Sequence, residues 1–232
     1  MSTLGDADFT ALYPFMSAEN GDRGDHDDEA VLEEVRRSIA GKAEQIVALR
    51  ELVADRLGAE LAACAQAMAR AFSAGGRLFA FGNGGSGTDA QALAQLFSHP
   101  PAGGAGEPPV RVRQLPAFCL AQDAAVLTAL GNDIGHEAVF SRQLAAFGRR
   151  GDVAVGLSTS GGSANVLRAL VEARRLGMTT VGVAGGDGGD MASCDAIDHL
   201  FVVPSASVHR IQEAQTTLCH VLWELVQREA AR

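Results

Sequence analysis

The sequence predicts an α/β fold in which helices cover both faces of a parallel sheet. Short, unbroken apolar runs alternate with amphipathic helical patterns from about residue 77 to the C-terminus. Strands that are apolar on both faces are typical of a parallel sheet buried between two helical layers. We therefore expect a three-layer αβα sandwich with a five-stranded parallel sheet, preceded by an N-terminal helical arm.

The N-terminal part of the chain has two different patterns. Residues 1–28 are polar and become acidic towards their end, so we expect a flexible acidic leader there. From 29 to 72, apolar residues recur every three or four positions, which predicts one or two long helices with a break near Gly58. This arm has more apolar surface than one small domain needs, so packing between subunits is a reasonable hypothesis. We assign residues 29–232, including the arm, to a single domain.

Strands and helices alternate through the rest of the chain, with two helices between the second and third strands and a short helix ending near Cys194 before the fifth strand. Right-handed crossovers place the loops that follow the strands at one edge of the sheet, where α/β proteins bind ligands. The expected strands are residues 77–82, 116–121, 153–157, 179–184 and 199–203, and the expected helices are 88–98, 123–130, 136–147, 163–176 and 207–229.

Two loops at this edge combine glycines with hydroxyl side chains. Residues 82–86 read Gly-Asn-Gly-Gly-Ser, and residues 158–163 read Ser-Thr-Ser-Gly-Gly-Ser. Glycine lets a ligand approach the backbone, and a helix N-terminus offers free N–H groups and the positive end of its dipole. The segment 151–165 alone fits an anion cradle and an ordinary serine-capped helix about equally well. Two such loops on one edge favour a phosphorylated ligand.

Composition excludes several other functions. The formal net charge of -9 and the scarcity of aromatic residues disfavour binding to nucleic acid or to acidic membranes. No segment is apolar enough to span a bilayer, and the N-terminus does not resemble a signal peptide, so we expect a cytoplasmic protein. The first glycine loop lacks both GxGxxG spacing and a Walker lysine, which disfavours a nucleotide site. The spacings of Cys64, Cys119, Cys194 and Cys219 fit no metal or redox motif.

The ordered set of loops resembles the sugar isomerase (SIS) domain, and within it the phosphoheptose isomerases, which interconvert sedoheptulose 7-phosphate and heptose 7-phosphate. The matching segments are residues 82–86, 131–133, 158–166, 185–189 and 210–213. The resemblance implies a homotetramer with sites at subunit contacts. It also implies that a phosphorylated sugar is bound by Asn83, Gly84, Gly85, Ser86, Asp133, Ser158, Thr159, Ser160 and Ser163.

The catalytic residues of the resembled family match only in part. The family reaction moves a proton between neighbouring carbons through an enediol, which needs a general acid–base pair. The resemblance implies Gln212 and His220 as catalytic residues, but Ala92 and Leu96 replace a family His and Glu. Many family members bind zinc through all four groups. One amide and one imidazole make a poor zinc site, so we expect weak or no zinc binding and no other cofactor.

Several residues could replace the missing pair. His99 lies on the same helical face as Ala92, and the candidate substitute acids are Asp89, Asp123, Asp133 and Glu213, each of which is also readable as a cap or a surface carboxylate. His220 is also readable as a packed core residue. His26, His136 and His199 are expected at the surface or in helix caps.

Two functions remain open on the sequence. The first is an aldose–ketose isomerase of a phosphorylated sugar. The second is a non-catalytic phosphosugar sensor or tetrameric adaptor protein. Intact phosphate loops fit both, the loss of ionisable groups at positions 92 and 96 favours the second, and the retention of Gln212 and His220 favours the first.

Overall fold

The computed structural model describes residues 25–101 and 112–231. The chain divides into two compact units, Met1–Glu44 and Gln45–Arg232. The first described element is the helix α2 (Asp25–Ser73), which begins four residues before the expected arm. The rest of the expected leader, residues 1–24, lies outside the described residues. Within the first unit, the side chains from residue 29 to 40 are exposed.

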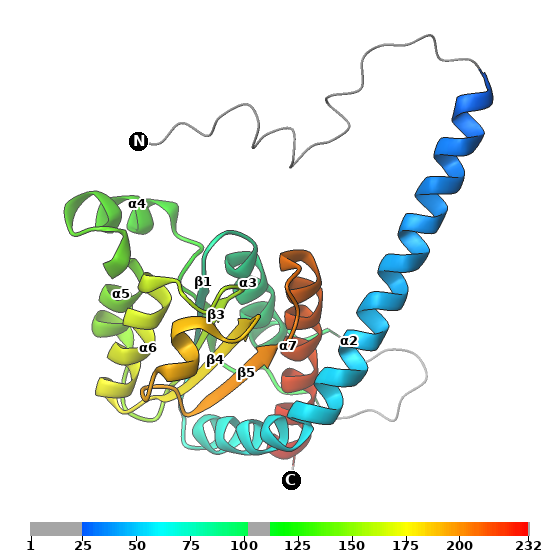
Figure 1. Cartoon of the computed structure of the whole chain (residues 1–232). Coiled ribbons are helices and arrows are strands. Elements are labelled where there is room, and N and C mark those ends of the chain that lie inside the picture. The colour runs from blue at the N-terminus through cyan, green and yellow to red at the C-terminus, as the bar shows by residue number, and fades with distance from the viewer. Residues whose placement is uncertain (1–24, 102–111, 232) are drawn as a thin grey trace. The chain divides into compact units, whose positions relative to one another are not determined.

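The helix α2 continues without interruption past Gly58, so the expected break is absent. A single glycine costs a helix only about 1 kcal/mol, and burial of apolar side chains on both sides of it outweighs that cost. Val53 precedes the glycine and Leu61 follows it, and both are buried. The helix does change direction in the cyan part of its course (Figure 1).

Five parallel strands form one sheet in the order β2-β1-β3-β4-β5, as the sequence predicts in number and direction (Figure 1). The strand β2 lies on one side of β1, and β3, β4 and β5 follow in turn on its other side. The sheet therefore has a topological switch point between β1 and β3. The strands are β1 (Leu78–Gly82), β2 (Ala117–Cys119), β3 (Val153–Ser158), β4 (Thr179–Gly185) and β5 (His199–Val203).

The helices lie close to their expected positions, with one difference that affects the site. The helix α3 begins at Gly84 instead of residue 88, because the Asn83 carbonyl already accepts a hydrogen bond from the Gly87 N–H. Most of the first glycine loop is therefore the first turn of the helix. The elements are α3 (Gly84–Ser98), α4 (Ala124–Asp133), η2 (His136–Ala138), α5 (Val139–Phe147), α6 (Ala164–Leu176), η3 (Gly189–Ser193) and α7 (Val208–Ala230).

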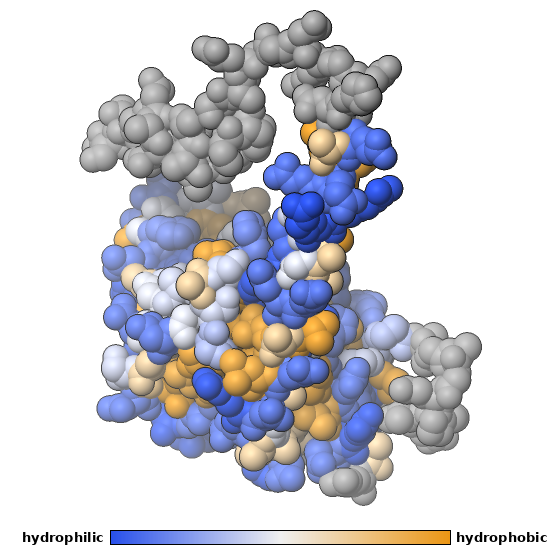
Figure 2. Space-filling view, turned by 45° about the vertical axis from the view of Figure 1, so that its right-hand side comes forward, coloured by the Kyte–Doolittle hydropathy of each residue, from blue (hydrophilic) through white to orange (hydrophobic). Residues whose placement is uncertain are grey.

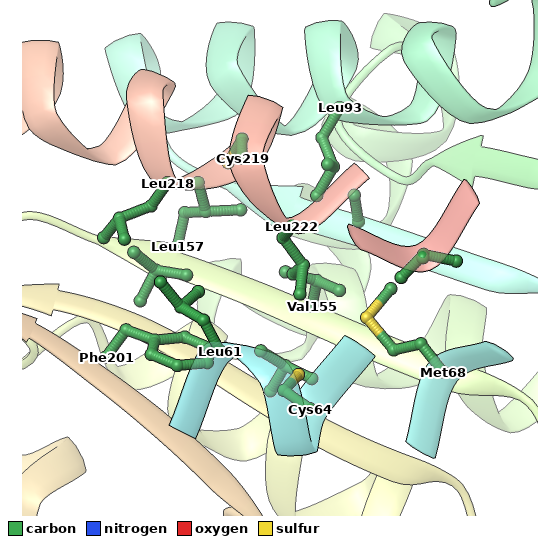
Figure 3. Packing of buried hydrophobic residues seen from close by; sticks show 14 of the residues in the cluster. Leu61, Cys64, Met68, Leu93, Val155, Leu157, Phe201, Leu218, Cys219 and Leu222 are labelled. Atoms are coloured by element: carbon green, nitrogen blue, oxygen red, sulfur yellow. The ribbon is translucent and has the colours of Figure 1, made fainter. Parts of the chain in front are cut away.

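The core has two parts, one on each face of the sheet. Alternation of side chains along a strand sends Leu78 and Ala80 to one part and Phe79 and Phe81 to the other. The first part joins α2, α3 and α7 to the sheet, and Figure 3 shows side chains from these elements meeting over β3 and β5. The second part joins α5 and α6 to the opposite face. This arrangement confirms the three-layer sandwich.

The four cysteines are unpaired. Cys64 is buried in the first part of the core, while Cys119 is only half-buried. Burial, reinforced by the charge of Glu60, raises the pKa of the Cys64 thiol to about 12. A thiol of this kind stays protonated and acts as a small apolar core group.

The surface is mixed in character. Figure 2 shows an apolar area in the middle of one face, surrounded by hydrophilic side chains. In the part of the chain that the structure describes, no helix is both long and apolar enough to cross a membrane.

Candidate functional site

The two glycine and hydroxyl loops meet at the switch point. Gly82 at the end of β1 lies opposite Leu157 in β3, so the two strands end level with each other. Residues 83–86 and 158–163 follow directly. The structure therefore places both predicted loops side by side at the carboxyl edge of the sheet, the position where open α/β sheets bind ligands.

The helices that leave these two loops are not capped by their own side chains. Asn83 and Ser163 occupy the N-cap positions of α3 and α6, yet neither side chain accepts a hydrogen bond from the first turn. In contrast, Asp123 caps α4 and Ser207 caps α7. The first N–H groups of α3 and α6 therefore lack a side-chain acceptor, and such groups favour a bound anion.

Three hydroxyl groups gather at the start of α6. The Ser158 Oγ lies 2.9 Å from the Ser163 Oγ and 3.5 Å from the Ser160 Oγ. The Ser160 Oγ also accepts a hydrogen bond from the Gly162 N–H at 3.2 Å. Ser158 is only 3 % exposed, whereas Ser160 is open to solvent. The cluster thus has a buried centre and an accessible rim, with half-buried Thr159 between Ser158 and Ser160.

The loop after β4 packs against the hydroxyl loop and supports it. Gly161 has a φ of 66°, and a Cβ atom there would overlap the carbonyl oxygen of Gly188. The Gly161 carbonyl in turn accepts a hydrogen bond of 3.0 Å from the Met191 N–H. The glycine segment 185–189 therefore shapes the hydroxyl loop by close backbone packing.

An amide pair joins the two loops across the switch point. The Asn83 Nδ2 donates to the Asn165 Oδ1 at 2.8 Å, and the Asn165 Nδ2 donates back to the Asn83 Oδ1 at 2.8 Å. Asn165 is only 3 % exposed. Its side chain also lies 3.2 Å from the His136 Nε2. The sequence analysis expected His136 at the surface or in a helix cap, and the residue is exposed, but it gave neither Asn165 nor His136 a place in the site. The signal available for Asn165 was its place two residues after Ser163.

A pocket of about 270 Å³ opens beside Asn83. Its walls come from the end of β1, the start of α3, the segment that follows β2, and α4, η2 and α5. The lining residues are Gly82, Asn83, Gly84, Gly87, Thr88, Gln91, Ala121, Leu127, His136 and Phe140.

Gln212 reaches the same region from α7. A Cβ atom on Gly85 would overlap the Gln212 Nε2, so the carboxamide lies directly against the first turn of α3. His220 is exposed and follows eight residues later on the same helix, about 12 Å along its axis. The prediction that His220 could be a packed core residue is wrong. Within one chain, Gln212 lies at the loops and His220 lies two turns away.

The candidate substitute acids differ in their surroundings. Asp89 lies one turn into α3, and its Oδ1 accepts a hydrogen bond from the Thr216 hydroxyl of α7 at 2.9 Å. Burial raises the pKa of Asp89, and the Thr216 bond opposes this shift only in part. Its Oδ2 is buried and has no hydrogen-bond partner among the described residues. Asp89 is therefore a carboxyl group disposed to hold a proton, one helical turn from the Gln212 contact.

The other substitutes have local roles. Asp123 caps α4, Glu213 pairs with Arg210, and exposed Asp133 accepts a hydrogen bond from the Asn132 side chain. His99 lies beyond the far end of α3 and contacts the Ser98 hydroxyl at 3.0 Å.

Within one chain, the described residues do not bring together a zinc site of the resembled kind. Ala92 and Leu96 are half-buried and carry no donor atom. Among residues 25–101 and 112–231, no three His, Cys, Asp or Glu side chains come together in a way that could hold a metal ion. Gln212 and His220 are too few and too far apart along α7 to do so within one chain.

Comparison with known proteins agrees with this geometry. The SIS domain model matches residues 43–185. A phosphoheptose isomerase of Roseiflexus sp. is 40% identical over 204 residues, which cover 86% of this chain and 89% of that protein. A phosphoheptose isomerase of Aquifex aeolicus is 42% identical over 197 residues, covering 85% and 96% respectively.

Solved structures show the same relationship. The phosphoheptose isomerase GmhA from Neisseria gonorrhoeae superposes with a TM-score of 0.75 at 33% identity, covering 84% of this chain and 99% of that one. The enzyme from Francisella tularensis gives a TM-score of 0.74 at 30% identity, covering 84% and 98%. The chain therefore belongs to the SIS domain family, in the homologous group that contains these phosphoheptose isomerases.

Proposed function

We propose that the chain binds a phosphorylated sugar at the switch point and interconverts its aldose and ketose forms, as a sugar-phosphate isomerase. The observation that carries this proposal is the pair of uncapped helices, α3 and α6. The Asn83–Asn165 amide pair links their N-termini, and the Ser158, Ser160 and Ser163 hydroxyls gather at the start of α6. Backbone N–H groups and hydroxyls of this kind complement a phosphate dianion. The similarity to phosphoheptose isomerases supplies the reaction class.

The residues divide into binding and proton-transfer roles. The hydroxyl cluster and helix N-termini hold the phosphate, with Asn83 beside the sugar. Gln212 carries a neutral carboxamide, which can orient an oxygen of the substrate but does not take up a proton at neutral pH. His220 is the imidazole that can accept a proton from carbon and return it to the neighbouring carbon. Because His220 lies about 12 Å along α7 from Gln212, we propose that it acts across a subunit contact of a homotetramer.

Proton exchange tests catalysis directly. We expect the protein to exchange the hydrogen next to the carbonyl of sedoheptulose 7-phosphate for deuterium in heavy water, observed by NMR. Replacement His220→Ala should abolish this exchange while leaving phosphosugar binding in place. Tight binding by the unmodified protein without any exchange would contradict the isomerase.

A second function has one observation in its favour. Ala92 and Leu96 lie on α3 in positions where the resemblance predicts an acid–base pair, and both are apolar and half-buried. A chain with intact phosphate loops and no turnover would be a phosphosugar sensor or a tetrameric adaptor. Phosphosugar binding without proton exchange is the outcome that would favour this second function.

We further propose that the protein works without zinc, as a cytoplasmic protein that binds neither nucleic acid nor membranes. The donor set at the α3–α7 contact and the net charge of -9 support this. We expect metal analysis of the purified protein after zinc addition and dialysis to find much less than one zinc per chain. Stoichiometric retention of zinc would contradict it.

A further inference from the structure

The pocket beside Asn83 combines polar and apolar walls. Thr88, Gln91 and His136 bring hydrogen-bonding groups, while Leu127 and Phe140 bring apolar surface. A chain of carbons that carry hydroxyl groups has the same mixed character. The pocket also shares Asn83 with the phosphate-binding loops, so it is continuous with the site already described.

His136 occupies a particular position in this pocket. Its Nε2 lies 3.2 Å from the Asn165 Nδ2, which also donates to the Asn83 Oδ1. An amide nitrogen has two hydrogens, so Asn165 can serve both acceptors at once. In this arrangement the His136 Nε2 accepts, and Nδ1 carries the ring proton. The ring is exposed and lines the pocket, so Nδ1 remains available as a donor to a ligand.

The same contacts fix the orientation of Asn83. A carboxamide can rotate by half a turn with little change in shape, and only its hydrogen-bond partners decide where the nitrogen lies. The direction of Asn83 is coupled to that of Asn165, and the direction of Asn165 is coupled to the ring nitrogen of His136 that carries the proton. Asn83 is exposed beside the pocket and keeps one N–H and one oxygen lone pair free for a ligand.

Other histidines of the described part are held differently. His199 pairs with Glu60 on α2, and His99 contacts Ser98 at the opposite end of α3 from the pocket. His136 combines a contact to the amide pair with a place in the pocket wall.

We propose that this pocket receives hydroxyl-bearing carbons of the sugar and that His136 is a specificity-determining residue that donates a hydrogen bond to one of their oxygens. This inference rests on the proposed phosphosugar binding and names the part of the site that recognises the sugar rather than the phosphate. His136 is thus separate in role from the Ser158, Ser160 and Ser163 cluster, which faces the phosphate.

Two ligands separate these roles. Sedoheptulose 7-phosphate reports on the sugar and phosphate contacts together, and inorganic phosphate, titrated by phosphorus NMR, reports on the loops alone. We expect His136→Phe, which keeps an aromatic ring but removes both nitrogens, to weaken sedoheptulose 7-phosphate binding by about tenfold and to leave inorganic phosphate binding unchanged. His136→Gln, which can still bond to Asn165, should recover part of the loss.

The control is His99→Phe, which lies about 20 Å from Asn83 along α3 and should change neither affinity. Unchanged binding of both ligands by His136→Phe would overturn the inference. Equal weakening of both would also overturn it, because His136 would then only hold the loops in shape. If the unmodified protein binds neither ligand, the proposed function itself fails, a result distinct from either outcome for His136.

Discussion

Asn83 and Ser163 stand where a polar side chain usually caps a helix, and both are bonded elsewhere. Asn83 pairs with Asn165, and Ser163 pairs with Ser158. Leaving a helix uncapped costs about 1 kcal/mol each time. Proteins keep such local costs where a binding site needs free donors, and two of them at one switch point indicate a site that is prepared for an anion.

The hydroxyl cluster can be tested by removing its accessible members. Replacement of Ser160 and Ser163 together by Ala should weaken phosphosugar binding by roughly 1–3 kcal/mol, because two donors to the phosphate are lost. Isothermal titration calorimetry measures this loss. Ser193→Ala is the matched control, since that exposed hydroxyl bonds only to the Asp190 carbonyl among described groups. An unchanged affinity in the double variant would place the ligand elsewhere.

Asp89 predicts a dependence of stability on pH. Its pKa is raised above 3.8 by burial, so the folded protein holds this proton more tightly than the unfolded chain does. As the pH rises above 3.8, the unfolded chain releases the proton first and the contribution of Asp89 to the unfolding free energy declines. The unfolding free energy of the natural protein minus that of Asp89→Asn should therefore fall as the pH rises. Urea denaturation at a series of pH values measures this difference.

Asp198 supplies the opposite sign as a control. Burial would raise its pKa, but hydrogen bonds from Thr180 and the nearby Arg174 outweigh burial and lower it below 3.8. The stability that Asp198 adds relative to Asp198→Asn should be lost as the pH falls below 3.8. Equal pH slopes for the two variants would contradict this assignment of Asp89.

Among the elements, the two glycine loops after β3 and after β4 offer a matched pair of substitutions. Gly161 and Gly186 both have a φ of 66°, but only at Gly161 would a Cβ overlap a neighbouring backbone, that of Gly188. Gly186→Ala should cost about 1–2 kcal/mol of stability through backbone strain alone and leave phosphosugar binding unchanged. Gly161→Ala should cost more and also weaken binding, because the hydroxyl loop must move away from its support.

Urea denaturation and calorimetry on the two variants give these quantities side by side. Equal stability loss and equal binding would show that the contact between the two loops does not shape the site.

The sequence predicted the elements well because each strand and helix depends on local patterns. Unbroken apolar runs marked the strands, and the glycine and hydroxyl loops after β1 and β3 were placed correctly at one edge. The start of α3 was not predicted, because Gly84 and Gly85 read as loop residues, whereas the helix begins directly after the extended N-cap residue Asn83. The continuity of α2 past Gly58 was also missed, since tertiary burial overrides the preference of one glycine.

At the scale of the whole molecule, the sequence could not give the contacts that complete the site. The strand order places β1 beside β3, and this long-range choice brings Asn83 to Asn165, eighty-two positions apart. His136 joins them from a third segment and has no local sequence signal for that role. The same limit applies to His220. It lies about 12 Å from Gln212 along α7, so the two side chains can serve one site only if they come from different subunits.

The last prediction concerns that assembly. Val35 and Ile39 lie one turn apart on α2 and are 47% and 63% exposed, an unfavourable state for apolar side chains unless another surface covers them. We expect the natural protein to sediment with four times the mass of one chain, and the double variant Val35→Lys, Ile39→Lys to sediment with a smaller mass. Val171→Lys on α6, where the valine is 52% exposed, should leave the mass unchanged.

Proton-exchange activity then distinguishes what a single chain can do from what requires the assembly. If His220 acts across a subunit contact, the dissociated variant should lose proton exchange on sedoheptulose 7-phosphate and still bind inorganic phosphate, because the hydroxyl loop is complete within one chain. A natural protein that sediments as a single chain and still catalyses exchange would contradict the tetramer. It would move the proton-transfer role to a group near Gln212 in the same chain, and Asp89 is the carboxyl group placed to take it.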